Sequence, residues 1–341
     1  MDVPVIDLQQ WEHGDRVALG ERVDDACRSI GFMQVVGHGI SPDVIAAMLT
    51  ASDDFFALPI DTKLCAAPAH PGINRGYAAA GTEALAYSLG VEQARPDLFE
   101  AFNVGPDHVD RSDPFFANDQ FGFFAQNVWP VEPASLRPAL NAYFAEAHRV
   151  ALCLTEVFSV ALGLGENWFG PFVDRSTVTM RVNHYERRPG DAAPDAAQMR
   201  MGAHTDYGIV TVLYADAVPG LEIVGPDGQW HGVTPAPGAL LVNLGDLTAQ
   251  WTNDRWRSTL HRVVPPPGSS DGSALRRSVA FFFDGNYNAK IECLSTCCAE
   301  QNPARYAPTT AGDHLIAKVL GPRTLTTSHA MDTAGDRLKI V

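Results

Sequence analysis

The sequence has little positive charge, and this lack excludes whole classes of partner. Its 25 lysines and arginines are outnumbered by 40 aspartates and glutamates, so the formal net charge is −15. Nucleic-acid-binding proteins usually carry a basic stripe, and anionic membrane surfaces attract basic segments. No such cluster of lysine and arginine occurs in this chain. We therefore expect no nucleic-acid partner and no membrane partner, while the oligomeric state stays open.

Long apolar runs and paired cysteines are also missing. The first residues, MDVPVIDL, lack the basic and apolar regions of a secretory signal. The most apolar stretch, residues 150–164, is shorter than the roughly 20 residues that a membrane span needs, and we expect a buried helix there. The chain has six cysteines but no CxxC pair. We expect reduced thiols and a cytoplasmic protein, and the neighbouring Cys297 and Cys298 carry no interpretation.

The first half of the chain alternates short strand and helix signals. A length of 341 residues can hold one large domain or two smaller ones. Proline in the first apolar run is typical of an edge strand, and Ser41 followed by Pro42 predicts the start of a helix. In chain order we expect an edge strand (residues 3–8), a helix (16–30), a buried strand (32–36), a helix (42–56), loops (70–81 and 106–114) and a long helical segment (133–164).

From residue 177 onward the pattern changes to short apolar or alternating segments. Turn signals such as Pro219–Gly220 and Pro237–Gly238 separate them. Several short strands at this spacing predict a sandwich or barrel of antiparallel sheet. The expected strands are residues 177–185, 209–214, 221–224, 239–242, 259–264 and 278–283.

The strongest chemical signal is His204–Thr205–Asp206. Side chains two residues apart in an extended segment point the same way, so His204 and Asp206 can face one cavity. His261, at the start of a later strand, can supply a third ligand. Two imidazoles and one carboxylate on one face of an octahedron leave positions open, which suits ferrous iron that binds a bidentate cosubstrate and dioxygen. An isolated His-x-Asp match is common by chance, and we expect His184 to point away from the metal.

A second signal is Arg276–Arg277–Ser278 at the start of a strand. Alternation places Arg276 and Ser278 on one face and Arg277 on the other. A guanidinium beside a hydroxyl is suited to gripping a carboxylate, such as the distal carboxylate of 2-oxoglutarate. The alternative is a surface arginine at a strand end, and we accept that alternative for Arg277.

A third signal lies in the segment MRVNHY. Its Arg181, Asn183 and Tyr185 share one face and could supply polar contacts from the opposite wall of the cavity. Each could instead be a core residue whose hydrogen bonds are satisfied within the protein. We predict Asn183 and Tyr185 as binding residues and keep Arg181 as a further candidate.

Together these segments resemble the isopenicillin N synthase-like family of Fe(II)/2-oxoglutarate dioxygenases. The resemblance covers nearly the whole chain. In the N-terminal region it rests on PVIDL, GFMQVVGHGI, FFALPIDTKL and NRGYAAAGTEAL. In the catalytic region it rests on RVNHYE, GAHTDYGIVTVL, NLGDLTAQWTNDRWRSTLHRV and RRSVAFFF.

The resemblance implies a fold that is mainly β with flanking helices, built on a double-stranded β-helix (jelly-roll) core. It divides one integrated fold into a mixed N-terminal region (1–130), a helical connection (131–172), the core (173–290) and a C-terminal extension (291–341). It also implies Fe(II) on His204, Asp206 and His261. The cosubstrate 2-oxoglutarate would be held by Arg276, Ser278, Asn183 and Tyr185.

The implied activity is an oxygenase that uses dioxygen and converts 2-oxoglutarate to succinate and CO₂ while oxidising a small organic molecule. Specialised metabolism, such as antibiotic or natural-product biosynthesis, is the expected setting. Hydroxylation is the default outcome, and desaturation or cyclisation requires only a different fate of the same substrate radical. Tyr77, Phe102 and Phe283 match segments that border the substrate in relatives, with aromatic core packing as the alternative for each phenylalanine.

Two other functions stay open at this point. The family's namesake uses iron and dioxygen without 2-oxoglutarate and employs an equivalent Arg/Ser pair on the carboxylate of its own substrate. A non-catalytic ligand-binding protein on the same scaffold is the third hypothesis, and the intact set of three metal ligands argues against it.

Overall fold

Two β-sheets form the centre of the fold in the computed structural model, which describes all residues except 71, 92–94, 120, 187–197, 266–274 and 325–341. The large sheet has eight strands in the order β1 (Val5–Asp7), β2 (Phe32–Val36), β10 (Leu240–Leu244), β7 (Val210–Ala215), β12 (Arg276–Phe283), β5 (Val178–Tyr185), β4 (Glu100–Val104) and β3 (Gly76–Ala78). The small sheet has four, in the order β6 (Met201–His204), β11 (His261–Val263), β8 (Leu221–Val224) and β9 (Trp230–Gly232). A separate pair joins β13 (Lys290–Ile291) to β14 (Thr309–Thr310). The two larger sheets make the jelly-roll core that the sequence predicted.

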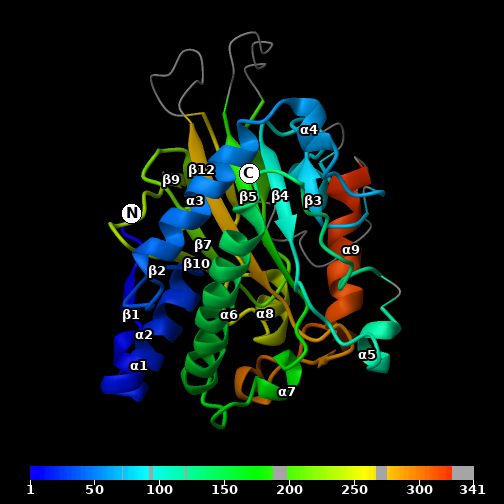
Figure 1. The fold of residues 1–341 in the computed structure, drawn as a ribbon. Coiled ribbons are helices and arrows are strands. Elements are labelled where there is room, and N and C mark those ends of the chain that lie inside the picture. Colours follow the sequence, from blue (N-terminus) through cyan, green and yellow to red (C-terminus); the bar gives the residue numbers. More distant parts are fainter. Residues whose placement is uncertain (71, 92–94, 120, 187–197, 266–274, 325–341) are drawn as a thin grey trace.

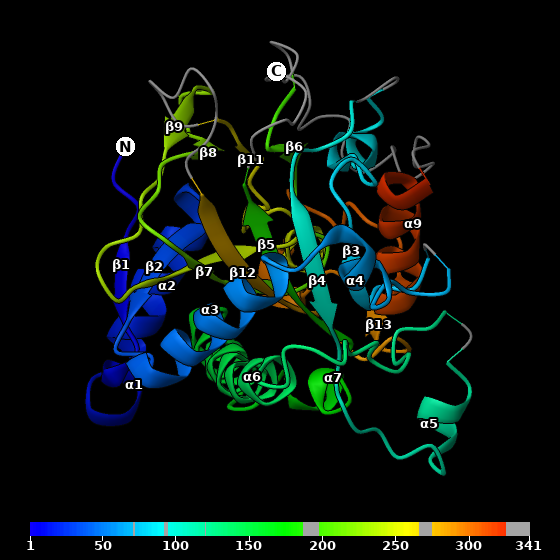
Figure 2. The same cartoon turned by 45° about the horizontal axis from the view of Figure 1, so that its top comes forward.

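Helices cover the outer face of the large sheet. Figure 1 shows α6 running along this face with α2 and α3 beside it, and Figure 2 looks nearly along α6. The helix α9 lies at the β3 end of the large sheet, far from β1. The α-helices are α1 (Gln9–His13), α2 (Arg16–Ser29), α3 (Pro42–Phe56), α4 (Ile60–Leu64), α5 (Pro114–Ala117), α6 (Leu136–Ala161), α7 (Gly170–Val173), α8 (Asp246–Trp251) and α9 (Ala311–Thr324), and the 3₁₀-helices are η1 (Leu85–Leu89) and η2 (Ser295–Cys297).

Local sequence explains where several of these elements begin. The Ser41 side chain accepts a hydrogen bond from the backbone N–H of Asp43, and Pro42 occupies the first turn of α3, as expected. Asp15 caps α2 in the same way. None of the helices within the described ranges is long and apolar enough to cross a lipid bilayer.

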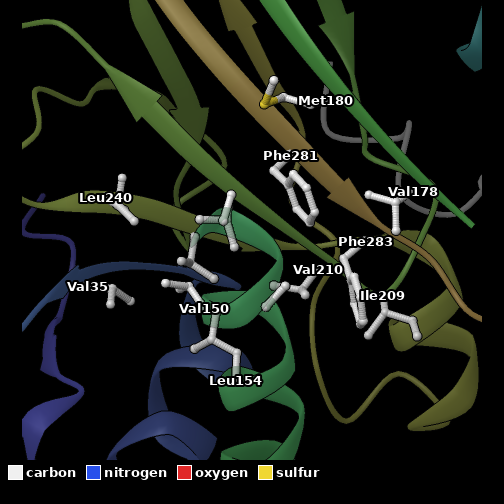
Figure 3. Close-up of a cluster of buried hydrophobic side chains, with 14 of the residues drawn as sticks. Val35, Val150, Leu154, Val178, Met180, Ile209, Val210, Leu240, Phe281 and Phe283 are labelled. Atoms are coloured by element: carbon white, nitrogen blue, oxygen red, sulfur yellow. The ribbon is translucent and has the colours of Figure 1, made fainter. Parts of the chain in front are cut away.

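The hydrophobic core lies between α6 and the large sheet. Figure 3 shows Phe281 and Phe283 of β12 on the same side of the sheet as Val150 and Leu154 of α6. All four side chains are fully buried. Because successive residues of a strand point to opposite faces, the intervening Phe282 points to the other side of the sheet, where it lines an internal cavity. The pleat of β12 therefore separates the core from the cavity.

The structure corrects three residues that we expected beside the substrate. Tyr77, Phe102 and Phe283 belong to the hydrophobic core and do not line the cavity. Phe102 is paired with Tyr77 in the sheet. Its ring packs edge-on against that of Phe55 in α3, with 4.9 Å between the ring centres, on the face of the sheet that the helices cover. These three predictions were wrong because each residue has the opposite pleat parity to the cavity face. In β12 it is Phe282 that faces the cavity.

Some elements were also missed. Residues 70–81, expected as a loop, contain the short edge strand β3, and β4 and α9 were not predicted. Strand β3 has only three residues, so its apolar pattern is too short to be recognised.

Replacing either phenylalanine by alanine tests this division of β12. We expect Phe281→Ala to lower the free energy of unfolding by about 3–5 kcal/mol, because it leaves a void in a fully packed core. Phe282→Ala, in the next position of the same strand, should lower it much less because its ring borders a cavity. Urea denaturation followed by circular dichroism measures both. Equal losses would contradict the division.

Candidate active site

Three buried side chains converge between the two sheets. His204 ends β6 and is paired directly with His261, the first residue of β11. Asp206 Oδ1 lies 3.9 Å from His204 Nε2 and 3.7 Å from His261 Nε2. One ligand atom from each residue lies within 4.8 Å of the others, and no second cluster of this kind occurs in the described part of the chain. The predicted residues are therefore together and spaced as metal ligands are.

Backbone carbonyls fix the orientation of both imidazoles. His204 Nδ1 lies 2.8 Å from the carbonyl oxygen of Gly202, and His261 Nδ1 lies 3.0 Å from that of Thr259. A carbonyl only accepts, so each Nδ1 carries the proton and each Nε2 keeps its lone pair for a metal. Burial, and then the neighbouring His261, lower the pKa of His204 to about 3, so its ring stays neutral near pH 7.

The carboxylate of Asp206 is held by two donors on the large sheet. Its Oδ2 accepts hydrogen bonds from Thr211 Oγ1 at 2.5 Å and from Asn243 Nδ2 at 2.6 Å. These bonds leave Oδ1 facing the two histidines. Neither donor was predicted from the sequence. The available signal was a polar residue inside an otherwise apolar strand, since Thr211 and Asn243 each interrupt a run of apolar residues.

A buried arginine lies at one end of the cavity. Arg276 is 2% exposed, and its Nε and Nη1 have no hydrogen-bond partner among the described residues. Its guanidinium carbon lies 5.1 Å from the centre of the Tyr185 ring. Ser278 Oγ, on the same face of β12, accepts a hydrogen bond from Asn183 Nδ2 at 3.3 Å. A buried charge with unpaired donors is costly, so this arrangement fits a bound carboxylate.

Arg277 lies on the opposite face of β12, as expected. Its Nη1 lies 2.6 Å from Asp53 Oδ2, and its Nε lies 3.6 Å from Asp216 Oδ2. His184 also points away from the metal site. Its ring stacks on the ring of Phe56, with 4.6 Å between the two ring centres.

The cavity between the sheets has a volume of about 190 Å³ and contains all of these cavity-facing groups. Arg181 lines it too, with its Nη2 2.7 Å from Glu83 Oε2 and its guanidinium 4.8 Å from the Phe99 ring centre. The remaining wall is largely apolar or aromatic. It includes Phe32, Leu85, Phe121, Phe123, Tyr207, Leu213, Phe282 and, from α9, Leu315, Ile316 and Val319.

A buried ion pair connects α9 to the segment that carries the metal ligands. Lys318 Nζ lies 3.0 Å from Asp246 Oδ2, and the two side chains are 3% and 6% exposed. The same oxygen accepts a hydrogen bond from Thr205 Oγ1 at 3.0 Å. The backbone N–H of Asp246 donates to the carbonyl of Asp206 at 2.8 Å. The helix that completes the cavity wall is thus fixed to the residue between two candidate ligands.

Comparisons with family models agree with this geometry. The model described as the 2OG-Fe(II) oxygenase superfamily matches residues 176–285. A second model, described as non-haem dioxygenase in morphine synthesis N-terminal, matches residues 3–132.

Individual relatives extend the likeness over most of the chain. Validamycin A dioxygenase of Streptomyces hygroscopicus subsp. limoneus is 36% identical, over 86% of this chain and 80% of the relative. The 2-oxoglutarate-Fe(II) type oxidoreductase hxnY of Emericella nidulans is 31% identical, over 91% of this chain and 87% of the relative. Among solved structures, a full-length Neurospora crassa protein in complex with alpha-KG and thymine superposes with a TM-score of 0.80. It has 29% sequence identity, and the match covers 93% of this chain and 96% of that protein.

Loss of the Thr211 hydroxyl should weaken metal binding. We expect Thr211→Val to lower the affinity for Fe(II) about 10- to 100-fold, because Asp206 loses one of the two donors that orient it. Thr179→Val is the matched control, since Thr179 and Thr211 flank the same residue of β12 and Thr179 makes no bond to Asp206. Anaerobic competition with a chromogenic chelator measures both affinities. Equal affinities in the two variants would show that the hydroxyl of Thr211 does not matter.

Loss of the Lys318 charge should loosen α9. We expect Lys318→Met to lower the free energy of unfolding by about 3–5 kcal/mol, because the carboxylate of Asp246 is left buried without its cation. Backbone amides of α9 should exchange with solvent faster, as hydrogen–deuterium exchange can measure. Lys290→Met removes a lysine from an exposed ion pair and should change stability by less than about 1 kcal/mol. If the two variants behaved alike, the anchoring role would be wrong.

Proposed function

The chain belongs to the 2OG-Fe(II) oxygenase superfamily, and on that premise we propose roles for the polar side chains around the metal ligands and around Arg276. The protein is a 2-oxoglutarate-dependent Fe(II) dioxygenase of a family whose members act on small molecules. Its cofactors are Fe(II), the cosubstrate 2-oxoglutarate and O₂. In our proposal His204, Asp206 and His261 hold the iron. Their mutual distances and the fixed orientation of both imidazoles support this assignment.

The observation that carries the proposal is the buried guanidinium of Arg276. Because its Nε and Nη1 have no partner among the described residues, the guanidinium has hydrogen-bond donors left for a carboxylate. In our proposal Arg276 and Ser278 bind the distal carboxylate of 2-oxoglutarate, and Asn183 and Tyr185 hold the cosubstrate from the next strand. Burial raises the pKa of Tyr185, so its phenol stays protonated and can donate a hydrogen bond.

When bound, iron would let dioxygen, the oxidant, convert 2-oxoglutarate to succinate and CO₂ and remove a hydrogen from the substrate. The chain contributes position and seclusion. The Arg276 end of the cavity would hold the distal carboxylate of the cosubstrate and so orient it relative to the three ligand side chains. The aromatic and aliphatic walls, completed by α9, exclude water from the reacting groups.

For the substrate side we propose a small molecule of specialised metabolism. Relatives named validamycin A dioxygenase and clavatol oxidase support this class. Hydroxylation is our default outcome, with desaturation or cyclisation as alternatives. Arg181, which lines the cavity, is the substrate-facing residue that remains from the sequence prediction. We place the enzyme in the cytoplasm, where reducing conditions keep iron ferrous and the six cysteines as the free thiols of the structure.

An anaerobic titration of the Fe(II) protein with 2-oxoglutarate tests the proposal. We expect a saturable visible charge-transfer band that is lost in His204→Ala. Arg276→Gln should raise the apparent Kd for 2-oxoglutarate about 10- to 100-fold, because hydrogen bonds from a charged group to the carboxylate are lost. Arg277→Gln is the matched control, since its side chain points away from the cavity and pairs with Asp53. It should leave the Kd unchanged.

Three outcomes would change the assignment. A protein that binds iron but gives no band would be a cosubstrate-free Fe(II) oxidase of the isopenicillin N synthase type. Failure to bind iron would favour a non-catalytic ligand-binding protein. Equal effects of the two arginine variants would show that Arg276 does not grip the cosubstrate.

A further inference from the structure

One acidic side chain of the cavity wall has no role in the site described above. Asp284 directly follows β12 and is 8% exposed, and it lines the cavity. Its backbone N–H donates to the carbonyl of Thr177 at 3.0 Å. Its carboxyl group has no hydrogen bond or ion pair with any described residue, and burial and Asp206 are the two influences on its charge.

Two other buried carboxylates and one half-buried carboxylate of the described chain have clear partners. Asp246 is paired with Lys318 at 3.0 Å and Glu83 with Arg181 at 2.7 Å. Asp97 accepts two backbone N–H groups, each at 2.8 Å. A carboxyl group buried without a partner is disfavoured in its charged form. Burial, and then the nearby Asp206, raise the pKa of Asp284 to about 7, as burial does for Asp97, so the missing partner is what distinguishes Asp284.

The position of Asp284 points to the substrate rather than to the cosubstrate. Arg276 begins β12 and Asp284 follows its last residue, so the two side chains mark opposite ends of the strand's cavity face. The metal site lies between them, because Phe282 is paired with Thr211, whose hydroxyl holds Asp206. If the cosubstrate extends from the metal towards Arg276, Asp284 borders the space on the other side.

The room beside Asp284 and the aromatic side chains of the cavity favour binding of a cation at this carboxyl group. A Cβ on Gly208 would lie only 1.4 Å from Asp284 Oδ1, so glycine at this position leaves the carboxyl group room to face the cavity. The same cavity is lined by the aromatic rings of Phe123, Tyr207 and Phe282, and aromatic faces attract cations. Arg75, which also lines the cavity, donates to backbone carbonyls and does not act on Asp284.

We propose that Asp284 determines specificity by binding a protonated amine of the substrate, so that the enzyme oxidises small molecules with a basic nitrogen. This inference rests on the proposed function, because it assigns the substrate end of the same cavity. A substrate hydroxyl would donate one hydrogen bond to Asp284 but leave the negative charge of the Asp284 carboxylate uncompensated. A substrate carboxylate would be repelled by Asp284.

Three compounds of one shape test the inference: cyclohexylamine, cyclohexanol and cyclohexanecarboxylate. Each is added anaerobically to the Fe(II)·2-oxoglutarate protein, and the shift of the visible band reports binding. With the wild-type protein we expect cyclohexylamine to bind at least about ten-fold more tightly than cyclohexanol, and the carboxylate not to bind. In Asp284→Asn, which keeps the shape but not the charge, the preference for the amine over the alcohol should disappear.

Asp227→Asn is the matched control, because Asp227 is an exposed aspartate paired with His231. It should keep the preference of the wild-type protein. The titration with 2-oxoglutarate alone distinguishes failure of the proposed function from failure of the inference about Asp284. If no band forms in the wild-type protein, the proposed function fails.

Given a normal band, two results would overturn the inference. The first is that the amine does not bind to the wild-type protein at tens of millimolar. The second is that the amine preference survives in Asp284→Asn. If iron binding were also weaker in that variant, Asp284 would act on the metal site instead.

Discussion

The alternation of side chains along β12 is the constraint on which the rest of the structure depends. One face of this strand packs Phe281 and Phe283 against α6, and the other presents Arg276, Ser278 and Phe282 to the cavity. A shift of register by one residue would put the arginine into the core and the phenylalanines into the site. The core contacts that stabilise the fold therefore also fix the register of the binding groups.

The same alternation explains what the sequence could and could not predict. His204, Asp206, Arg276 and Ser278 were predictable because each pair lies two residues apart, so the parity within one strand was sufficient. The errors at Tyr77 and Phe102 arose because the parity of β3 and β4 relative to β5 depends on strand pairing, which is not visible in one segment. Thr211 and Asn243 contact Asp206 from strands distant in sequence. Ion pairs such as Lys318–Asp246 likewise join segments that only the fold brings together.

The metal site is organised by groups that carry no net charge of their own. Carbonyl oxygens set the tautomer of both histidines, and a hydroxyl and an amide orient the Asp206 carboxylate. Neutral partners fix geometry without competing with the metal for the charge of its ligands. The charged contact lies one step further out, where Lys318 and Asp246 fix α9 to Thr205. Neutral hydrogen bonds thus hold the metal ligands in place, and the Lys318–Asp246 ion pair anchors the α9 part of the cavity wall.

Charge balance then constrains what the remaining space can bind. With Fe(II) and dianionic 2-oxoglutarate in place, the charges of Asp206 and Arg276 complete a neutral set, and Glu83 neutralises Arg181. None of these side chains forms an ion pair with Asp284, because Arg181 is paired with Glu83 and no cation among the described residues acts on the Asp284 carboxyl group. Binding of the cosubstrate therefore does not relieve the cost of this buried acid. A group that arrives with the substrate must do so, and a cation does it more fully than a neutral donor.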